Sequence, residues 1–176
     1  MITTRIRGDY LAKIYQDYLT PGERVLDIGC GNGIVSQILI DKLGVNLLGT
    51  DIDQYLKKEI PFKLMNRDSI LPFKDQEFDY ALFNDVLHHT TKIRELIKEA
   101  KRVSGKVLIF EMEPGNLNKF VDKTFNWFHR PQMKVPLNFL TKEEWAGLLS
   151  ELNLEFAILE LEKPFYYPLK HLLIEI

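Results

Sequence analysis

Residues 25–35 have the sequence Val-Leu-Asp-Ile-Gly-Cys-Gly-Asn-Gly-Ile-Val. Strand-forming residues come first, glycines follow at every second position, and a helical pattern begins immediately afterwards. Glycine permits positive φ and close approach to a ligand, while the first N–H groups of a helix are unpaired and carry partial positive charge. We therefore predict a strand, a tight turn and a helix that can hold a nucleotide-like cofactor. A glycine turn of this kind can also be purely structural.

Length and composition favour one compact domain over residues 1–176, because the chain is 45% hydrophobic and long enough for a sizeable core. The formal net charge of −2 provides no basic field, so duplex nucleic acid is not an expected partner. Cys30 is the only cysteine, which excludes an intramolecular disulfide. Because the N-terminus also lacks the apolar core of a signal peptide, we expect a cytoplasmic protein. We expect no membrane span and no metal site.

The N-terminal segment, residues 1–22, is predicted to cover the sheet with an amphipathic helix over residues 8–19. Tyr10, Leu11 and Ile14 recur there at helical spacing, and Pro21 and Gly22 end the pattern. Core packing is one interpretation of this helix. In the other, Arg7 or Tyr10 also closes over a ligand carboxylate.

An acidic residue is predicted at the end of the second strand. A helix from Ile34 to Gly44 returns the chain to a strand over residues 45–50, which leads into Asp51. In dinucleotide-binding and related folds, a carboxylate here accepts hydrogen bonds from ribose hydroxyls. The alternative is an N-cap for a helix after Gln54. We assign the ribose role to Asp51 and the cap to Asp53.

The remaining pattern alternates strands with helices, which predicts an α/β fold with a parallel sheet. Strands are expected at 62–66, 78–83, 106–111, 154–160 and 169–176. One helix is expected at 91–103. A second begins at a capping box formed by Thr141 and Glu144 and continues to Leu152. Ligands of such sheets lie beyond the carboxyl ends of the strands. The polar and glycine residues expected at that edge are Asp27, Gly29, Asp51, Asp68, Asn84 and Glu111.

Residues 114–138 interrupt the alternation and are predicted to form a lid or substrate insertion. The segment contains a possible helix over 117–128 that is rich in aromatic residues, which either contact a substrate or belong to the core. Lys119, Lys123 and Arg130 make it locally basic. A small ligand with an apolar body and an acidic group is one hypothesis that follows.

Four segments resemble the motifs of class I S-adenosylmethionine-dependent methyltransferases, in the type 11-like, small-molecule branch. Residues 25–33 resemble the first motif and residues 49–53 the second. Asp68 with Leu71-Pro72-Phe73 and Phe78-Asp79 is similar to the third block, and Leu87-His88-His89 to the segment after it. The resemblance implies a three-layer doubly wound sandwich. Its seven-stranded, mostly parallel sheet has the order 3-2-1-4-5-7-6, with strand 7 antiparallel.

The resemblance also implies S-adenosyl-L-methionine as cofactor, S-adenosyl-L-homocysteine as product and a small-molecule methyl acceptor. The backbones of Gly29, Cys30 and Gly31 would pass beside the methionine part of the cofactor. Asp27 and the Asn84 carbonyl would place its amino group, and Asp51 would accept both ribose hydroxyls. At the adenine end, Ile52 would pack on the ring, and Asp68 would accept from the exocyclic amine with Ser69 alongside.

His89 is the candidate general base, because it follows the fourth strand and imidazole titrates near neutrality. Alternatively, His88 and His89 only pack or form hydrogen bonds there. No Asn-Pro-Pro-Tyr, Asp-Pro-Pro-Tyr or Pro-Cys sequence follows the fourth strand, which disfavours amino-methylation of adenine or glutamine and cytosine C5 chemistry. Two rival functions are a non-catalytic cofactor-binding subunit and a nicotinamide-dependent oxidoreductase. The oxidoreductase is disfavoured by Ile34, where its fingerprint requires glycine or alanine.

Overall fold

The computed structural model describes residues 2–65, 69–115, 136, 138–162, 164–167 and 169–176, which form one seven-stranded sheet of order β3-β2-β1-β4-β5-β7-β6. The strands are β1 (Arg24–Ile28), β2 (Asn46–Asp51), β3 (Phe62–Leu64), β4 (Phe78–Asn84), β5 (Ser104–Met112), β6 (Ala157–Glu160) and β7 (His171–Glu175). β7 is antiparallel to both of its neighbours, and the other pairs are parallel. The strand order and the orientation of the last strand confirm the prediction.

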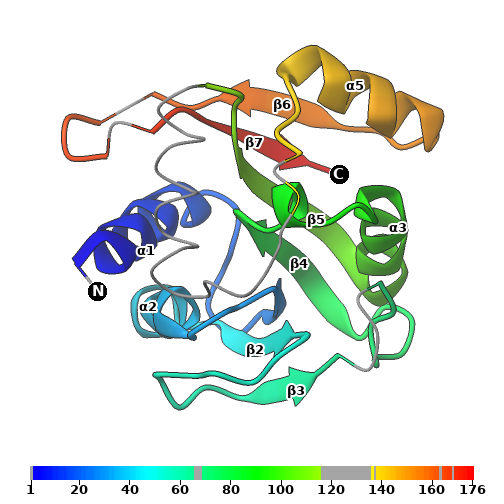
Figure 1. Ribbon diagram of the computed structural model, residues 1–176. Coiled ribbons are helices and arrows are strands. Elements are labelled where there is room, and N and C mark those ends of the chain that lie inside the picture. The colour runs from blue at the N-terminus through cyan, green and yellow to red at the C-terminus, as the bar shows by residue number, and fades with distance from the viewer. Residues whose placement is uncertain (1, 66–68, 116–135, 137, 163, 168) are drawn as a thin grey trace.

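Helices cover both faces of this sheet, as Figure 1 shows. α1 (Ile2–Tyr15) and α2 (Ile34–Leu43) pack on one face, where Leu11, Tyr15 and Leu39 are fully buried. α3 (Ile93–Val103) and α5 (Lys142–Glu151) cover the other face with a second buried cluster. A short 3₁₀ helix, η1 (Leu87–His89), follows β4. The predicted three-layer sandwich is therefore confirmed.

Local sequence signals account for several element ends. The Thr141 side chain accepts from the Glu144 N–H at 3.2 Å, and the Glu144 carboxylate accepts from the Thr141 N–H at 2.7 Å. This is the predicted capping box, which begins α5. Gly44 ends α2 in the left-handed conformation, with φ of 66°. Within the described residues, no helix combines the length and the apolar character that crossing a membrane requires.

Other predicted elements differ from the structure. α1 spans Ile2–Tyr15, whereas the prediction was 8–19, and β3, β5, β6 and β7 also have shifted ends. The helix expected after Gln54 is absent, so Asp53 caps no helix. There the Lys57 N–H donates to the Asn32 carbonyl at 2.9 Å, and Pro61 disfavours helical conformation in the residue before it. Most of the predicted lid at 114–138, including its possible helix, lies outside the described residues.

Candidate functional site

The glycine turn joins β1 to α2 at the carboxyl edge of the sheet. Gly29, Gly31 and Gly33 have positive φ of 75°, 58° and 74°, a conformation that side chains disfavour. The Thr50 carbonyl at the end of β2 accepts hydrogen bonds from the Gly29 N–H at 2.7 Å and the Cys30 N–H at 3.2 Å. The turn is thus attached to the neighbouring strand, and it lies at the point between β1 and β4 where the strand order reverses.

Asp51 lies beside this turn at the end of β2. Its carboxylate accepts from the Gly31 N–H at 2.9 Å and from the Ile52 N–H at 2.7 Å, and the residue is 9% exposed. A carboxylate oxygen can accept more than one hydrogen bond. Asp51 therefore holds the glycine turn in place and has the chemistry to accept hydroxyl groups from a ligand at the same position.

Asp27 and Asn84 form a buried polar cluster beneath the turn. The two Asp27 carboxylate oxygens accept from the Ser36 hydroxyl at 2.6 Å and from the Asn84 amide at 3.0 Å. The Tyr15 hydroxyl of α1 donates to the Asn84 side-chain oxygen at 2.7 Å. Burial raises the pKa of Asp27 to about 6, although the bonds from Ser36 and Asn84 act in the opposite direction. These bonds fix the side chain of Asn84, while the pairing of β4 with β5, in which Asn84 lies opposite Phe110, positions its backbone.

Glu111, at the end of β5, organises the turn after β4. One of its carboxylate oxygens accepts from the Val86 N–H at 2.7 Å and the Leu87 N–H at 2.5 Å. The other lies 2.5 Å from Nδ1 of His88, and both side chains are 2% exposed. The His88 ring also stacks on Phe139, with centroids 4.7 Å apart. The acid thus sets both the backbone of η1 and the orientation of the imidazole.

Asp85 adopts a left-handed conformation with φ of 57° and forms a second ion-pair cluster. Its carboxylate accepts from Nη1 of Arg7 at 3.0 Å and lies 3.1 Å from Nε2 of His171. Burial by itself would raise the pKa of Asp85, but His171 and Arg7 hold it well below its usual range. Arg7 therefore reaches the carboxyl edge of the sheet, where it pairs with a protein carboxylate. The Tyr10 hydroxyl donates to the Glu162 backbone carbonyl at 2.8 Å.

Asp85, His88 and Glu111 have ligand atoms within 4.8 Å of one another, a spacing that could hold a metal ion. Protein groups already engage these atoms: Arg7 and His171 contact Asp85, while two backbone N–H groups and His88 contact Glu111. Each buried carboxylate therefore has charged or hydrogen-bonding partners within the protein, which a buried charge needs to offset its loss of hydration. We therefore interpret the three residues as part of a polar network.

Comparison with known proteins gives the family. The family model described as "Methyltransferase domain" matches residues 4–158. The chain belongs to this methyltransferase family. It is 30% identical over 137 residues to "Uncharacterized protein MJ1123" of Methanocaldococcus jannaschii, a match that covers 76% of this chain and 65% of that protein. It is 31% identical over 144 residues to 2-methyl-6-phytyl-1,4-hydroquinone methyltransferase of Synechocystis sp., covering 77% of this chain and 42% of that enzyme. The chain thus spans less than two thirds of either relative.

Solved structures share the fold of this methyltransferase domain. The YcgJ protein from Bacillus subtilis has a TM-score of 0.66 at 17% identity, with 96% of each chain covered. Phosphoethanolamine N-methyltransferase 2 of Haemonchus contortus, solved in complex with S-adenosyl-L-methionine, has a TM-score of 0.63 at 18% identity, covering 87% of this chain and 38% of that chain. At such low identity, the likeness is one of fold.

The methyltransferase domain brings most of the predicted site residues to one edge. Six of these residues lie in the glycine turn or next to it: Asp27, Gly29, Cys30, Gly31, Asp51 and Asn84. Ile52 follows Asp51 and is 46% exposed, so its apolar side chain is available to a planar ligand. Asp68 lies outside the described residues, and Ser69, which follows it, is in a turn and partly buried. His89 lies in η1 beside His88, with ring centroids 4.0 Å apart.

The partners that hold these residues are not predictable from local sequence patterns. Glu111 was placed at the correct edge, but its contact with His88 was not predicted. No role in the site is predicted for Tyr15, Asp85 or His171. The one available signal was the presence of polar groups within otherwise apolar segments, since buried polar atoms require hydrogen-bond partners.

Gly29→Ala is expected to destabilise the fold by about 2–4 kcal/mol, because positive φ and overpacking both carry a cost. An added Cβ would lie 2.6 Å from Cγ1 and 2.7 Å from Cγ2 of Val86, and φ at Gly29 is 75°. Urea denaturation measures the change. Gly147→Ala is the matched control, because nothing lies within 4 Å of its Cβ position in α5 and alanine favours a helix. Equal stability of the two variants would contradict the strained turn.

Proposed function

We propose that this chain transfers a methyl group from S-adenosyl-L-methionine to a small-molecule acceptor and releases S-adenosyl-L-homocysteine. The observation that carries the proposal is the hydrogen bond from the Gly31 N–H to the Asp51 carboxylate, at 2.9 Å. The bond holds the glycine backbone beside the Asp51 carboxylate, where the strand order reverses, which is the usual ligand position in open α/β sheets and supports Asp51 as the acceptor for ribose hydroxyls. Membership of the methyltransferase family supports the same assignment.

The site's residues suit the different parts of this cofactor. Asp51 would accept the ribose hydroxyls, while the exposed side chains of Ile52 and Tyr55 offer apolar surface for adenine. Asp68 and Ser69 would contact the adenine amine. The backbones of Gly29, Cys30 and Gly31 would lie along the methionine part, and the Asn84 carbonyl, with Asp27 beneath it, would face the amino group. The carboxylates and backbone carbonyls at this edge of the sheet would also interact favourably with the positively charged sulfonium.

The cofactor, when bound, supplies an electrophilic methyl group on a positively charged sulfur. Methyl transfer is an in-line displacement, in which the acceptor's nucleophilic atom bonds to the methyl carbon as the carbon–sulfur bond breaks. The protein's task is to hold the reacting atoms in line. A base is needed only if the acceptor must lose a proton. We propose His89 for that role, and His88 as a second candidate because Glu111 orients its ring through Nδ1.

The acceptor is proposed to be a small molecule. A curated relative that is a hydroquinone methyltransferase supports this class. The basic residues of the segment 114–138, from Lys119 to Arg130, support an acceptor with an acidic group. We also propose a cytoplasmic location, because Cys30 is a free thiol and disulfide-free proteins are typical of reducing compartments.

An acceptor screen with methyl-labelled S-adenosyl-L-methionine tests the proposed function. Label should pass to one class among phenols, hydroquinones, amines and carboxylic acids, with charged and neutral members compared in each class. His88→Gln and His89→Gln then identify the base, because its loss should lower kcat about 10²–10⁴-fold on an acceptor that must be deprotonated. Cofactor binding without label transfer to any acceptor would favour a non-catalytic subunit, and binding of NAD alone would favour an oxidoreductase.

Cofactor affinity is expected to depend on pH through Asp27. Its pKa of about 6 in the unliganded protein should fall when a cofactor ammonium binds nearby, so binding releases a proton. Affinity should therefore be roughly tenfold weaker at pH 5 than at pH 7, where Asp27 is already ionised. Calorimetry in two buffers of different ionisation enthalpy measures the released proton. An Asp27→Asn variant should lose the dependence; an unchanged slope in this variant would exclude Asp27 as its origin.

A further inference from the structure

Two consecutive residues at the end of β4 are each held by the same helix, α1. The Tyr15 hydroxyl donates to the Asn84 side chain at 2.7 Å, and Nη1 of Arg7 donates to the Asp85 carboxylate at 3.0 Å. Arg7, Leu11 and Tyr15 are spaced four residues apart, so they share one face of the helix, and Leu11 and Tyr15 are fully buried. The packed face of α1 therefore brings a guanidinium group to the carboxyl edge of the sheet.

Arg7 places a positive charge among buried acids. The buried carboxylates at this edge are Asp27, Asp51, Asp85 and Glu111. Burial alone would lower the pKa of Arg7, but Asp85 and then Asp27 act to raise it, so the guanidinium stays charged. Burial raises the pKa of Asp27, and the charge of Arg7 acts in the opposite direction. The guanidinium is therefore close enough to Asp27 for the two charges to interact.

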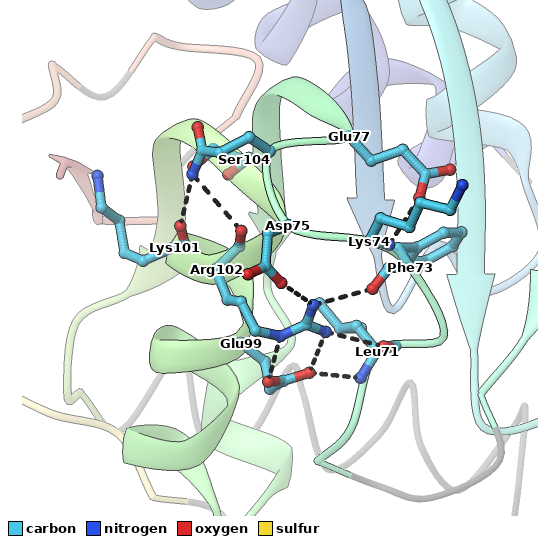
Figure 2. A network of polar contacts seen from close by, with 10 residues as sticks. Leu71, Phe73, Lys74, Asp75, Glu77, Glu99, Lys101, Arg102 and Ser104 are labelled. Atoms are coloured by element: carbon cyan, nitrogen blue, oxygen red, sulfur yellow. Dashed lines mark hydrogen bonds and ion pairs between the residues drawn. The ribbon is translucent and has the colours of Figure 1, made fainter.

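The guanidinium of Arg7 has donors to spare. Arginine carries several N–H donors in a fixed fork, and among the described residues only Asp85 accepts from Arg7. Its Nε is buried and has no acceptor in that part of the chain. Arg102 of α3 is similarly exposed, 32% against 30% for Arg7, but its three guanidinium nitrogens all donate to protein acceptors, as Figure 2 shows. Because buried donors normally have acceptors, the spare donors of Arg7 suit a ligand that supplies them.

The proposed function puts an amino acid beside this guanidinium. The Asn84 carbonyl, with Asp27 beneath it, would face the amino group of the cofactor. The carboxylate of the cofactor is attached to the same carbon as that amino group, so both charged groups lie in one small region. Asp85, which holds Arg7, directly follows Asn84 in the chain. A carboxylate is also a group that the planar guanidinium fork binds well, through two parallel hydrogen bonds.

We propose that Arg7 binds the carboxylate of the cofactor's amino acid part and thereby selects S-adenosyl compounds that carry this group. Asp85 and His171 are positioning residues, because Asp85 holds Nη1 of Arg7 and Nε2 of His171 lies 3.1 Å from the same Asp85 carboxylate. The ammonium and the carboxylate of the ligand then face opposite charges, on Asp27 and Arg7 respectively. The inference rests on the proposed function, because it assumes that S-adenosyl compounds bind at Asp51.

The test compares calorimetric affinities for S-adenosylhomocysteine and its decarboxylated analogue, S-adenosyl-3-thiopropylamine, which keeps the amino group. The wild type should prefer S-adenosylhomocysteine by about tenfold or more, because a hydrogen bond to a charged group is lost with the carboxylate. In Arg7→Met the affinity for S-adenosylhomocysteine should fall about tenfold, while that for the analogue should not fall, so the preference disappears. Arg7→Lys should be intermediate, because it keeps the charge without the planar fork.

Arg102→Met is the matched control, because it removes an arginine of similar exposure whose ion pairs with Glu99 and Asp75 serve the fold. It should lower the melting temperature and keep the wild-type preference. Arg7→Gln replaces Arg7→Met if the latter does not fold, because glutamine is neutral but keeps an N–H donor for Asp85, and the same loss of preference is expected.

Two results would overturn the inference. One is a wild type that binds S-adenosylhomocysteine and the decarboxylated analogue equally well. The other is a folded Arg7 variant with a lower melting temperature but an unchanged preference, since a purely structural ion pair with Asp85 predicts that result. Failure of the wild type to bind S-adenosylhomocysteine at all would instead contradict the proposed function itself.

Discussion

Removal of residues 171–176 is expected to abolish folding. β7 lies between β5 and β6, so its loss would divide the sheet. Leu172, Leu173 and Ile174 are each 1% exposed or less. Truncation of one buried leucine or isoleucine to alanine typically costs about 2–5 kcal/mol, while a whole domain is stable by only about 5–15 kcal/mol. The stability lost with these three buried side chains is therefore expected to exceed the total stability of the domain.

Circular dichroism and urea denaturation of the truncated chain measure this effect. A graded version compares two residues that face each other across β7 and β6, Leu173 and Leu159. Leu173→Ala should lose about 2–5 kcal/mol of stability. Leu159→Ala, at a side chain that is 45% exposed on the edge strand, should lose far less. Cooperative unfolding of the truncated protein would refute the role given to β7.

Asp51→Ala is expected to weaken binding of S-adenosylhomocysteine about 10- to 150-fold, the range for loss of a charged hydrogen-bonding group. Two effects act together. The variant loses the acceptor for the ribose hydroxyls, and it also loses the contact that holds the Gly31 N–H at 2.9 Å. Isothermal titration calorimetry measures the change, and denaturation shows whether the variant remains folded.

Asp53→Ala is the matched control for this measurement. Asp53 is an exposed carboxylate two residues further along the same segment, and it caps no helix. Its removal should leave the affinity within about twofold of the wild type, because solvent screens an exposed charge. If the two variants bind equally well, Asp51 is not the ribose acceptor.

The sequence predicted the elements whose signals are local. The glycine turn at Gly29, the capping box at Thr141 and the end of α2 at Gly44 all depend on neighbouring residues, and all three appear as expected. The approach of Asp51 to the turn was also predictable, because a strand, a crossover helix and a second strand bring the two together.

The remaining parts of the site depend on contacts between distant segments. Asp85 and His171 are 86 positions apart, and His88 and Glu111 are 23 apart. No local pattern specifies which buried acid meets which imidazole. The missing helix after Gln54 has a similar cause, because the turn at Asn32 supplies an acceptor for the Lys57 N–H that the local sequence does not reveal. The acid–imidazole pairs and the conformation after Gln54 therefore depend on tertiary hydrogen bonds rather than on local propensity.

The most direct test of the cofactor site is a crystal structure of the protein with S-adenosylhomocysteine. The account predicts that the ribose hydroxyls contact the Asp51 carboxylate, with the homocysteine part along Gly29 to Gly31 and its amino group at the Asn84 carbonyl. A ligand bound elsewhere, with Gly31 and Asp51 untouched, would contradict the proposed cofactor site.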